Sequence, residues 1–121
     1  MPNLIELNAI SKKDGNDTYR IDLKSQGEGI LGYRKAGVTF GGHYHTGESA
    51  SKNPETLFLL SGVIELRTRD INTDQILKKN LTAPIKIEVP INQWHQLYAY
   101  TDVCFLELNS LEEHINDTKY E

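Results

Sequence analysis

The chain has 121 residues, a formal net charge of −4, 38% hydrophobic residues and 25% charged residues. This length and composition are typical of one soluble globular domain, so we expect residues 1–121 to form a single domain. The acidic balance disfavours a nucleic-acid partner, and no apolar run is long enough to span a bilayer. The single cysteine and the lack of a signal-peptide pattern predict a cytoplasmic protein.

In chain order, the sequence predicts a succession of short strands with almost no helical periodicity. The expected strands are Leu4–Leu7, Tyr19–Leu23, Ile30–Lys35, Val38–Phe40, Thr56–Leu60, Val63–Thr68, Ile76–Asn80, Ile85–Val89, Trp94–Tyr100 and Val103–Asn109. Ser61-Gly62 predicts a tight turn between two antiparallel strands, and Asp70–Asp74 predicts a second turn. Ser110–Ile115 can form one helical turn capped by Ser110, followed by a loose polar tail.

So many short strands at close spacing favour an all-β sandwich or closed barrel. A small barrel encloses a cavity just wide enough for side chains or one ligand. Polar residues that point into this cavity are therefore the candidates for function.

His43 and His45 are the first such candidates. Side chains alternate between the two faces of a strand, so residues i and i+2 point the same way. Two neutral imidazoles on one face are good ligands for Zn, Fe, Ni, Cu or Mn. His-x-His alone is a weak signal, and a pair that binds no metal is the alternative.

Around this pair, five residues separate Gly37 from His43, six separate Glu55 from Gly62, and four separate Pro90 from His95. This order of residues resembles the motifs of the cupin superfamily. The first cupin motif is Gly, five residues, His-x-His, three or four residues, Glu, six residues and Gly. The second is Pro-x-Gly-x-x-His, then three residues and Asn. The matching positions here are Gly37, His43, His45, Glu55 and Gly62 for the first motif, and Pro90 and His95 for the second. The resemblance implies a double-stranded β-helix (jelly-roll) barrel over about residues 29–109, with N-terminal strands in 1–28 and a polar tail in 110–121.

The resemblance also implies that one divalent metal ion binds to His43, His45, Glu55 and His95. Nine residues separate His45 from Glu55, which we interpret as a loop insertion over Thr46–Pro54. Glu48 is the competing carboxylate, but Glu55 keeps the six-residue distance to Gly62.

Two further positions depart from the second motif. Asn92 replaces its glycine, and asparagine tolerates the left-handed turn that a glycine would adopt there. Ala99 replaces the closing asparagine, so we expect different supporting contacts around the metal.

A closer similarity is to cupins of surface-polysaccharide biosynthesis, including the cupin domain of capsular UDP-sugar reductases. It rests on His43-Tyr44-His45, on the run from Glu55 to Gly62 and on Glu65-Leu66-Arg67. It implies a metal-dependent isomerase or epimerase of a sugar or nucleotide sugar. An iron oxygenase and a non-catalytic binding module are the alternatives. The polar side chains that we consider as catalytic partners are Tyr33, Arg34, Arg67, Arg69, Tyr98 and Tyr100.

The remaining expectations concern the barrel lining, the tail and assembly. Leu57, Leu59, Leu97 and Ala99 share a face with Glu55 or His95 by alternation, so we expect a mostly apolar lining. His114 lies in the polar tail, where we expect it to be solvated. The early strands can pair with the sheet edge of a second copy, which predicts a homodimer, or can close the chain's own barrel. A small molecule such as a carbohydrate is the expected ligand.

Overall fold

The computed structural model describes residues 1–52 and 54–120, which form eleven strands, one 3-10 helix and one short α-helix. The elements are β1 (Asn8–Ser11), β2 (Thr18–Asp22), η1 (Lys24–Gln26), β3 (Glu28–Arg34), β4 (Thr39–Tyr44), β5 (Glu55–Ser61), β6 (Val63–Asp70), β7 (Leu77–Thr82), β8 (Ile85–Val89), β9 (Gln93–Ala99), β10 (Val103–Glu107), α1 (Leu111–Asn116) and β11 (Lys119–Tyr120).

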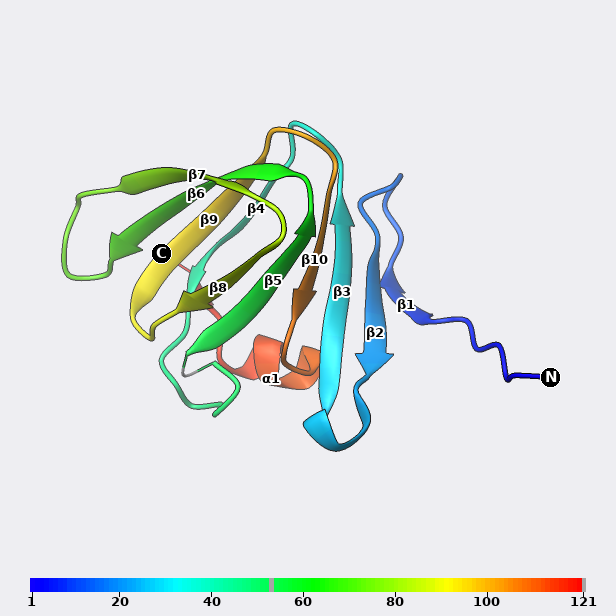
Figure 1. Cartoon of the computed structure of the whole chain (residues 1–121). Helices are drawn as coiled ribbons and strands as arrows, with labels where there is room; N and C mark the ends of the chain where they lie inside the picture. Colours follow the sequence, from blue (N-terminus) through cyan, green and yellow to red (C-terminus); the bar gives the residue numbers. More distant parts are fainter. Residues whose placement is uncertain (53, 121) are drawn as a thin grey trace.

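The strands form two antiparallel sheets that face each other (Figure 1). The first sheet has the order β1-β2-β3-β10-β5-β8, and the second has the order β11-β4-β9-β6-β7. From β3 onward the chain alternates between the two sheets, except at the β6–β7 hairpin, since β4, β6, β7, β9 and β11 belong to the second sheet while β5, β8 and β10 belong to the first. This alternation is the jelly-roll arrangement, so the predicted all-β jelly-roll fold is confirmed.

The core lies between the two sheets and comes from the inward positions of their strands. Strand β5 shows the pattern, because Leu57 and Leu59 are buried while Leu60 is exposed. The buried apolar residues of this cluster are Leu57, Leu59, Ile64, Ile87, Val89, Leu97, Ala99, Val103 and Phe105. The inward positions predicted for Leu57, Leu59, Leu97 and Ala99 are therefore confirmed.

Two sequence-based predictions about strands are wrong. Ser61-Gly62 does not connect two hydrogen-bonded neighbours, since β5 and β6 lie in different sheets and the turn carries the chain across the barrel. Leu4–Leu7 forms no strand: its side chains are exposed, and the first strand is β1, which pairs with β2. The turn at Asp70–Asp74 does join paired strands, β6 and β7, as predicted.

The C-terminal segment is ordered against the barrel, in contrast to the expected loose tail. Helix α1 begins after Ser110, whose hydroxyl accepts a hydrogen bond from the Glu113 amide, as the predicted cap requires. Strand β11 then pairs with β4. Asp117 between them is fully buried, and its carboxylate accepts hydrogen bonds from the amides of Thr46 and Gly47, which compensate the cost of burying it. Sequence patterns do not show such a contact between distant residues.

Among the residues that the structure describes, no helix is both long enough and apolar enough to cross a membrane.

Candidate metal centre

Four buried side chains converge at one end of the space between the sheets. His43 lies on β4, His45 directly follows that strand, His95 lies on β9, and Glu55 begins β5 in the opposite sheet. One ligand atom from each lies within 4.8 Å of all the others, and all four residues are buried. The structure therefore brings together the four residues that the sequence singled out, in a group that can hold one metal ion.

The local backbone explains why the histidines meet. His43 is the register partner of His95 in the β4–β9 pair, and a bulge interrupts this register between Gly41 and His43. Gly41 and Gly42 both have a φ of 82°, a conformation that glycine adopts without strain. Just before β9, Asn92 has a φ of 59°, and its main-chain amide donates to the carbonyl of His45 at 2.8 Å. Asparagine thus takes the turn conformation expected at this position.

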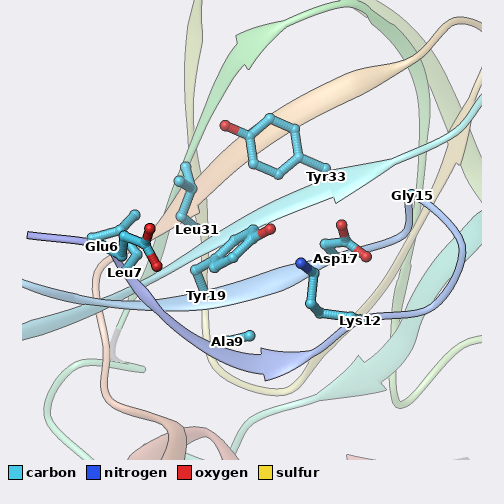
Figure 2. Close-up of a pocket in the computed structure, with 9 residues that line it drawn as sticks. All are labelled: Glu6, Leu7, Ala9, Lys12, Gly15, Asp17, Tyr19, Leu31 and Tyr33. Carbon is cyan, nitrogen blue, oxygen red and sulfur yellow. The ribbon is translucent and has the colours of Figure 1, made fainter.

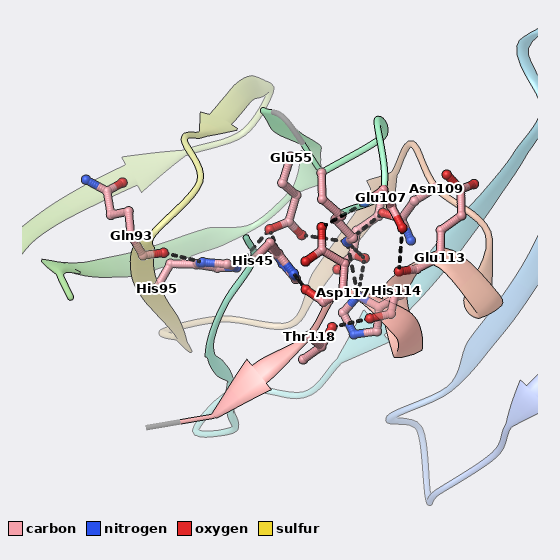
Figure 3. Close-up of polar contacts among 12 residues, drawn as sticks. His45, Glu55, Gln93, His95, Glu107, Asn109, Glu113, His114, Asp117 and Thr118 are labelled. Carbon is pink, nitrogen blue, oxygen red and sulfur yellow. Dashed lines mark hydrogen bonds and ion pairs between the residues drawn. The ribbon is translucent and has the colours of Figure 1, made fainter. Parts of the chain in front are cut away.

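Hydrogen bonds fix the orientation of two of the rings. Nδ1 of His45 lies 2.6 Å from the carbonyl oxygen of Asp117, and Nδ1 of His95 lies 3.3 Å from that of Gln93 (Figure 3). A carbonyl only accepts, so each Nδ1 carries the proton and each Nε2 offers a lone pair. Such contacts orient the imidazoles that bind metals in proteins.

These lone pairs point at Glu55. Its Oε2 atom lies 2.8 Å from Nε2 of His45 and 2.9 Å from Nε2 of His95. With the ring protons on Nδ1, the facing atoms are all acceptors. Accordingly, Nε2 of His45 and Oε2 of Glu55 are buried without a hydrogen-bond partner among the described residues. A cation that accepts these lone pairs would satisfy them, so the residues present fit a metal ion.

The electrostatics favour the protonation states that bind metals. Burial, followed by the neighbouring His95, lowers the pKa of His43 to about 3, so this ring is neutral. Burial raises the pKa of the Glu55 carboxyl, but the surrounding groups, among them the positive charge of Lys52, lower it below its ordinary value, so this carboxyl is ionised. Neutral imidazole and ionised carboxylate are the forms that coordinate a metal.

A cavity of about 120 Å³ opens beside the four residues. Its apolar wall includes Phe40, Leu57, Leu97 and Phe105, and its polar lining includes Arg34, Glu107 and His114. Glu107 follows the inward positions Val103 and Phe105 on β10, so alternation along that strand could have predicted it.

His114 was expected in solvent, but it lies against this cavity with its side chain 22% exposed. Burial and the positive charge of Lys52 lower its pKa to about 4. Burial and the negative charge of Glu55 raise the pKa of the Glu107 carboxyl. Two ionisable groups thus face the space next to the candidate metal.

Most of the other polar candidates lie elsewhere. Arg67 pairs with Glu65 at 2.6 Å and stacks over Tyr98, outside the barrel. Tyr100 donates to Glu65, also on the outer face of the second sheet. Arg69 lies over the ring of Trp94, and Tyr33 is on the outer face of the first sheet. Of the six candidates, only Arg34 lines the cavity, with its guanidinium over Phe40 and Phe105.

Several of the described residues of the loop over Thr46–Pro54 contact the C-terminal segment and Glu55, and Asn53 lies outside the described residues. Glu48 is not among the four converging residues: its side chain is 61% exposed and lies 3.6 Å from Lys119. Lys52 of the same loop is fully buried next to Glu55. Nothing in the sequence pattern signalled Lys52, since a lysine in a polar loop is normally solvated.

A larger, open pocket of about 660 Å³ lies on the outside of the first sheet, against the N-terminal strands (Figure 2). Tyr19, Leu31 and Tyr33 form its floor, and Glu6, Leu7 and Lys12 lie around it. None of the four converging residues lines this pocket, so it is separate from the candidate metal centre.

The fold and the site together define a cupin-fold protein, and comparison with solved structures agrees. The capsular polysaccharide assembling protein CapF from Staphylococcus aureus matches with a TM-score of 0.75 at 20% identity, over 97% of this chain and 32% of that chain. The cupin domain of Drosophila melanogaster CENP-C matches with a TM-score of 0.61 at 15% identity, over 87% and 76%. Oxalate decarboxylase from Bacillus subtilis, which has Mn(II) centres, matches with a TM-score of 0.61 at 18% identity, over 83% and 26%.

The chain thus spans about a third of the length of CapF, and the identities are low enough that the likeness concerns the fold. No family model matches the sequence. No curated protein matches it either.

Proposed function

We propose that this protein binds one divalent metal ion through His43, His45, His95 and Glu55. The observation that carries the proposal is a pair of buried atoms, Nε2 of His45 and Oε2 of Glu55, that face each other at 2.8 Å and have no hydrogen-bond partner in the part of the chain that the structure describes. Two lone pairs held together away from water are costly unless a cation binds them. Three imidazole nitrogens and one carboxylate oxygen suit Zn, Fe, Mn, Ni or Cu.

We further propose that the protein is a metal-dependent isomerase or epimerase that acts on a sugar or nucleotide sugar. When bound, the metal would supply a Lewis acid that polarises a carbonyl group. Removing a proton from the neighbouring carbon also needs a base. Glu107 is a carboxylate at the cavity with a raised pKa, which suits it to take that proton. A base beside the metal supports an isomerase over a non-catalytic binding module.

The size of the cavity restricts what enters it. About 120 Å³ is well below the roughly 300–1,000 Å³ of pockets that enclose a whole drug-sized ligand. Only the reacting end of a sugar fits inside, and a nucleotide attached to it would stay outside the barrel. Arg34 lines the cavity, and the N–H groups that it does not donate to Asp17, Tyr33 and Thr18 can bind a hydroxyl, carbonyl or phosphate oxygen of this end.

The comparisons support two parts of this proposal. CapF is a capsular polysaccharide assembling protein, which favours a carbohydrate substrate. Oxalate decarboxylase has Mn(II) centres, which favours a metal in this fold.

The test is proton exchange next to a carbonyl. Protein loaded with Zn²⁺ or Mn²⁺ is incubated in D₂O with a panel of ketoses and aldoses, free and nucleotide-linked, and deuterium incorporation is read by ¹H NMR. Metal-dependent exchange that is lost in Glu107→Gln supports the isomerase. The absence of exchange across the panel, together with oxygen consumption by iron-loaded protein, would instead favour an oxygenase.

We also propose that residues 1–121 are a single domain that forms a homodimer in the cytoplasm. Strand β1 is an edge strand, and the preceding Leu4 and Ile5 are 84% and 83% exposed, so this edge can pair with a second copy. Sedimentation of the full chain over a range of concentrations tests the dimer, and a monomer at all concentrations would contradict it.

A further inference from the structure

Lys52 lies in an environment that is unusual for a lysine. Its side chain is fully buried, although it comes from the polar loop between β4 and β5. A buried ammonium is strongly unfavourable unless it is fully paired and hydrogen-bonded. We therefore expect the ammonium of Lys52 to have a function at the candidate metal centre that an apolar side chain would not have.

Each N–H of the ammonium has a partner. Nζ lies 2.8 Å from Oδ1 of Asn109, 3.0 Å from Nδ1 of His114 and 3.3 Å from Oε1 of Glu55. Oε2 of Glu107 lies farther away, at 3.7 Å. An ammonium has three donors, and the three nearer groups are acceptors, so the hydrogen-bonding capacity of Lys52 is used in full.

Because of the contact with Lys52, the two oxygens of the Glu55 carboxylate have different surroundings. Oε1 accepts from Lys52, whereas Oε2 faces Nε2 of His45 and of His95 and has no hydrogen-bond partner among the described residues. A free carboxylate can bind a metal through one oxygen or through both. Here one oxygen is already occupied by a buried cation on the same chain.

We propose that Lys52 is a positioning residue that restricts Glu55 to binding the metal through Oε2 alone. This keeps a coordination position free for a water molecule or a substrate oxygen. The inference rests on the proposed metal function, and it concerns how many sites on the ion remain open.

The variant Lys52→Met tests this role, because methionine keeps much of the length of the side chain and removes its charge. Without the ammonium, Oε1 is free to join Oε2 on the metal and replace one bound water. The affinity for the ion should be equal or higher, since a like charge is removed and one ligand atom is gained. A role in packing alone predicts the opposite, namely weaker binding with more water on the ion.

The experiment uses Mn²⁺ as the probe ion in the full chain. The number of bound waters is read from the broadening of the Mn²⁺ EPR signal in ¹⁷O-enriched water, and the affinity from titration of the same signal. We expect Lys52→Met to hold one water fewer than the wild type, with no loss of affinity. Lys86→Met is the matched control, because Lys86 is about half exposed and lies on the outer side of β8. An unchanged or larger number of waters in Lys52→Met overturns the proposal.

A second variant distinguishes the loss of the positioning role from a failure of the protein to fold. Lys52→Met leaves Glu107 without its nearby cation, so Lys52→Met combined with Glu107→Gln is compared with Glu107→Gln alone. If neither Lys52 variant folds by circular dichroism, Lys52 is a structural residue and the positioning role is abandoned. Failure of the wild type to bind Mn²⁺ or any other ion is a different result, because it removes the metal site itself.

Discussion

Nδ1 of His45 lies 2.6 Å from the carbonyl oxygen of Asp117, a residue 72 positions later in the chain. The Asp117 carboxylate accepts hydrogen bonds from the amides of Thr46, Gly47 and Ser49, immediately after that histidine. One C-terminal residue therefore orients the ring of a candidate ligand and holds the loop behind it. The candidate metal centre depends on this contact as much as on the strands.

Asp117→Ala tests this dependence. The substitution leaves several buried donors without an acceptor, so we expect a loss of about 1–3 kcal/mol in the free energy of unfolding. Metal affinity should fall as well, because the carboxylate no longer anchors Asp117, whose main-chain carbonyl orients the His45 ring; contacts of this kind are worth about 10–100-fold in affinity. Chemical denaturation of metal-free protein and a chelator competition measure the two effects. Asp74→Ala, in an exposed turn, is the control, and equal effects in both variants would contradict the account.

The same carboxylate predicts a pH dependence. Burial raises the pKa of Asp117, but hydrogen bonds from Thr46, Ser49 and Gly47 lower it below the ordinary aspartate value of 3.8. A group with a lowered folded pKa stabilises the fold above its unfolded pKa and loses this contribution as the pH falls through the folded value. The stability gap between the wild type and Asp117→Asn should therefore be constant above pH 3.8 and shrink below it. A gap that widens in acid would show that this sign is wrong.

Two neighbouring leucines test the inward alternation of β5. Leu59 is fully buried in the core, whereas Leu60 is 48% exposed. We expect Leu59→Ala to lower the free energy of unfolding by about 2–5 kcal/mol, and Leu60→Ala to change it by less than about 1 kcal/mol. Urea denaturation of both variants measures the difference. Comparable losses would mean that the two side chains are not on opposite faces.

Alanine substitutions at two glycines distinguish the cost of backbone strain from the cost of a steric clash. Gly62 and Gly27 have φ values of 96° and 86°, so alanine is strained at both positions. At Gly27 a Cβ would meet nothing within 4 Å, whereas at Gly62 it would overlap the carbonyl oxygen of Asp102. Gly27→Ala should cost about 1–2 kcal/mol, and Gly62→Ala clearly more. Thermal unfolding of both variants decides this, and equal costs would argue against close packing at the turn between the sheets.

Local patterns were sufficient to predict part of this molecule. Alternation along a strand gave the common direction of His43 and His45 and the inward positions of Leu57 and Leu59. The residue preferences of caps and turns gave the roles of Ser110 and Asn92. Each of these features depends on a few residues that are close in the sequence, so it can be read without a structure.

The features that were missed depend on contacts between distant residues. Lys52 resembles any solvated loop lysine until Glu55, Asn109 and His114 are brought around it by the fold. His114 and Asp117 lie in a polar tail whose burial follows only from the pairing of β11 with β4. The turn at Ser61-Gly62 was misread for the same reason, because its residues do not reveal that the next strand belongs to the other sheet.

Elemental analysis tests the central claim most directly. The protein is purified without chelator or affinity metal, and the bound metal is counted in the wild type and in the variants His45→Ala, His95→Ala, Glu55→Gln and Glu48→Gln. We expect one equivalent of a divalent transition metal in the wild type and in Glu48→Gln, and loss of most of it in the other three. The absence of metal from the wild type, even after Zn²⁺, Fe²⁺, Mn²⁺, Ni²⁺ or Cu²⁺ is added back, would contradict the metal centre.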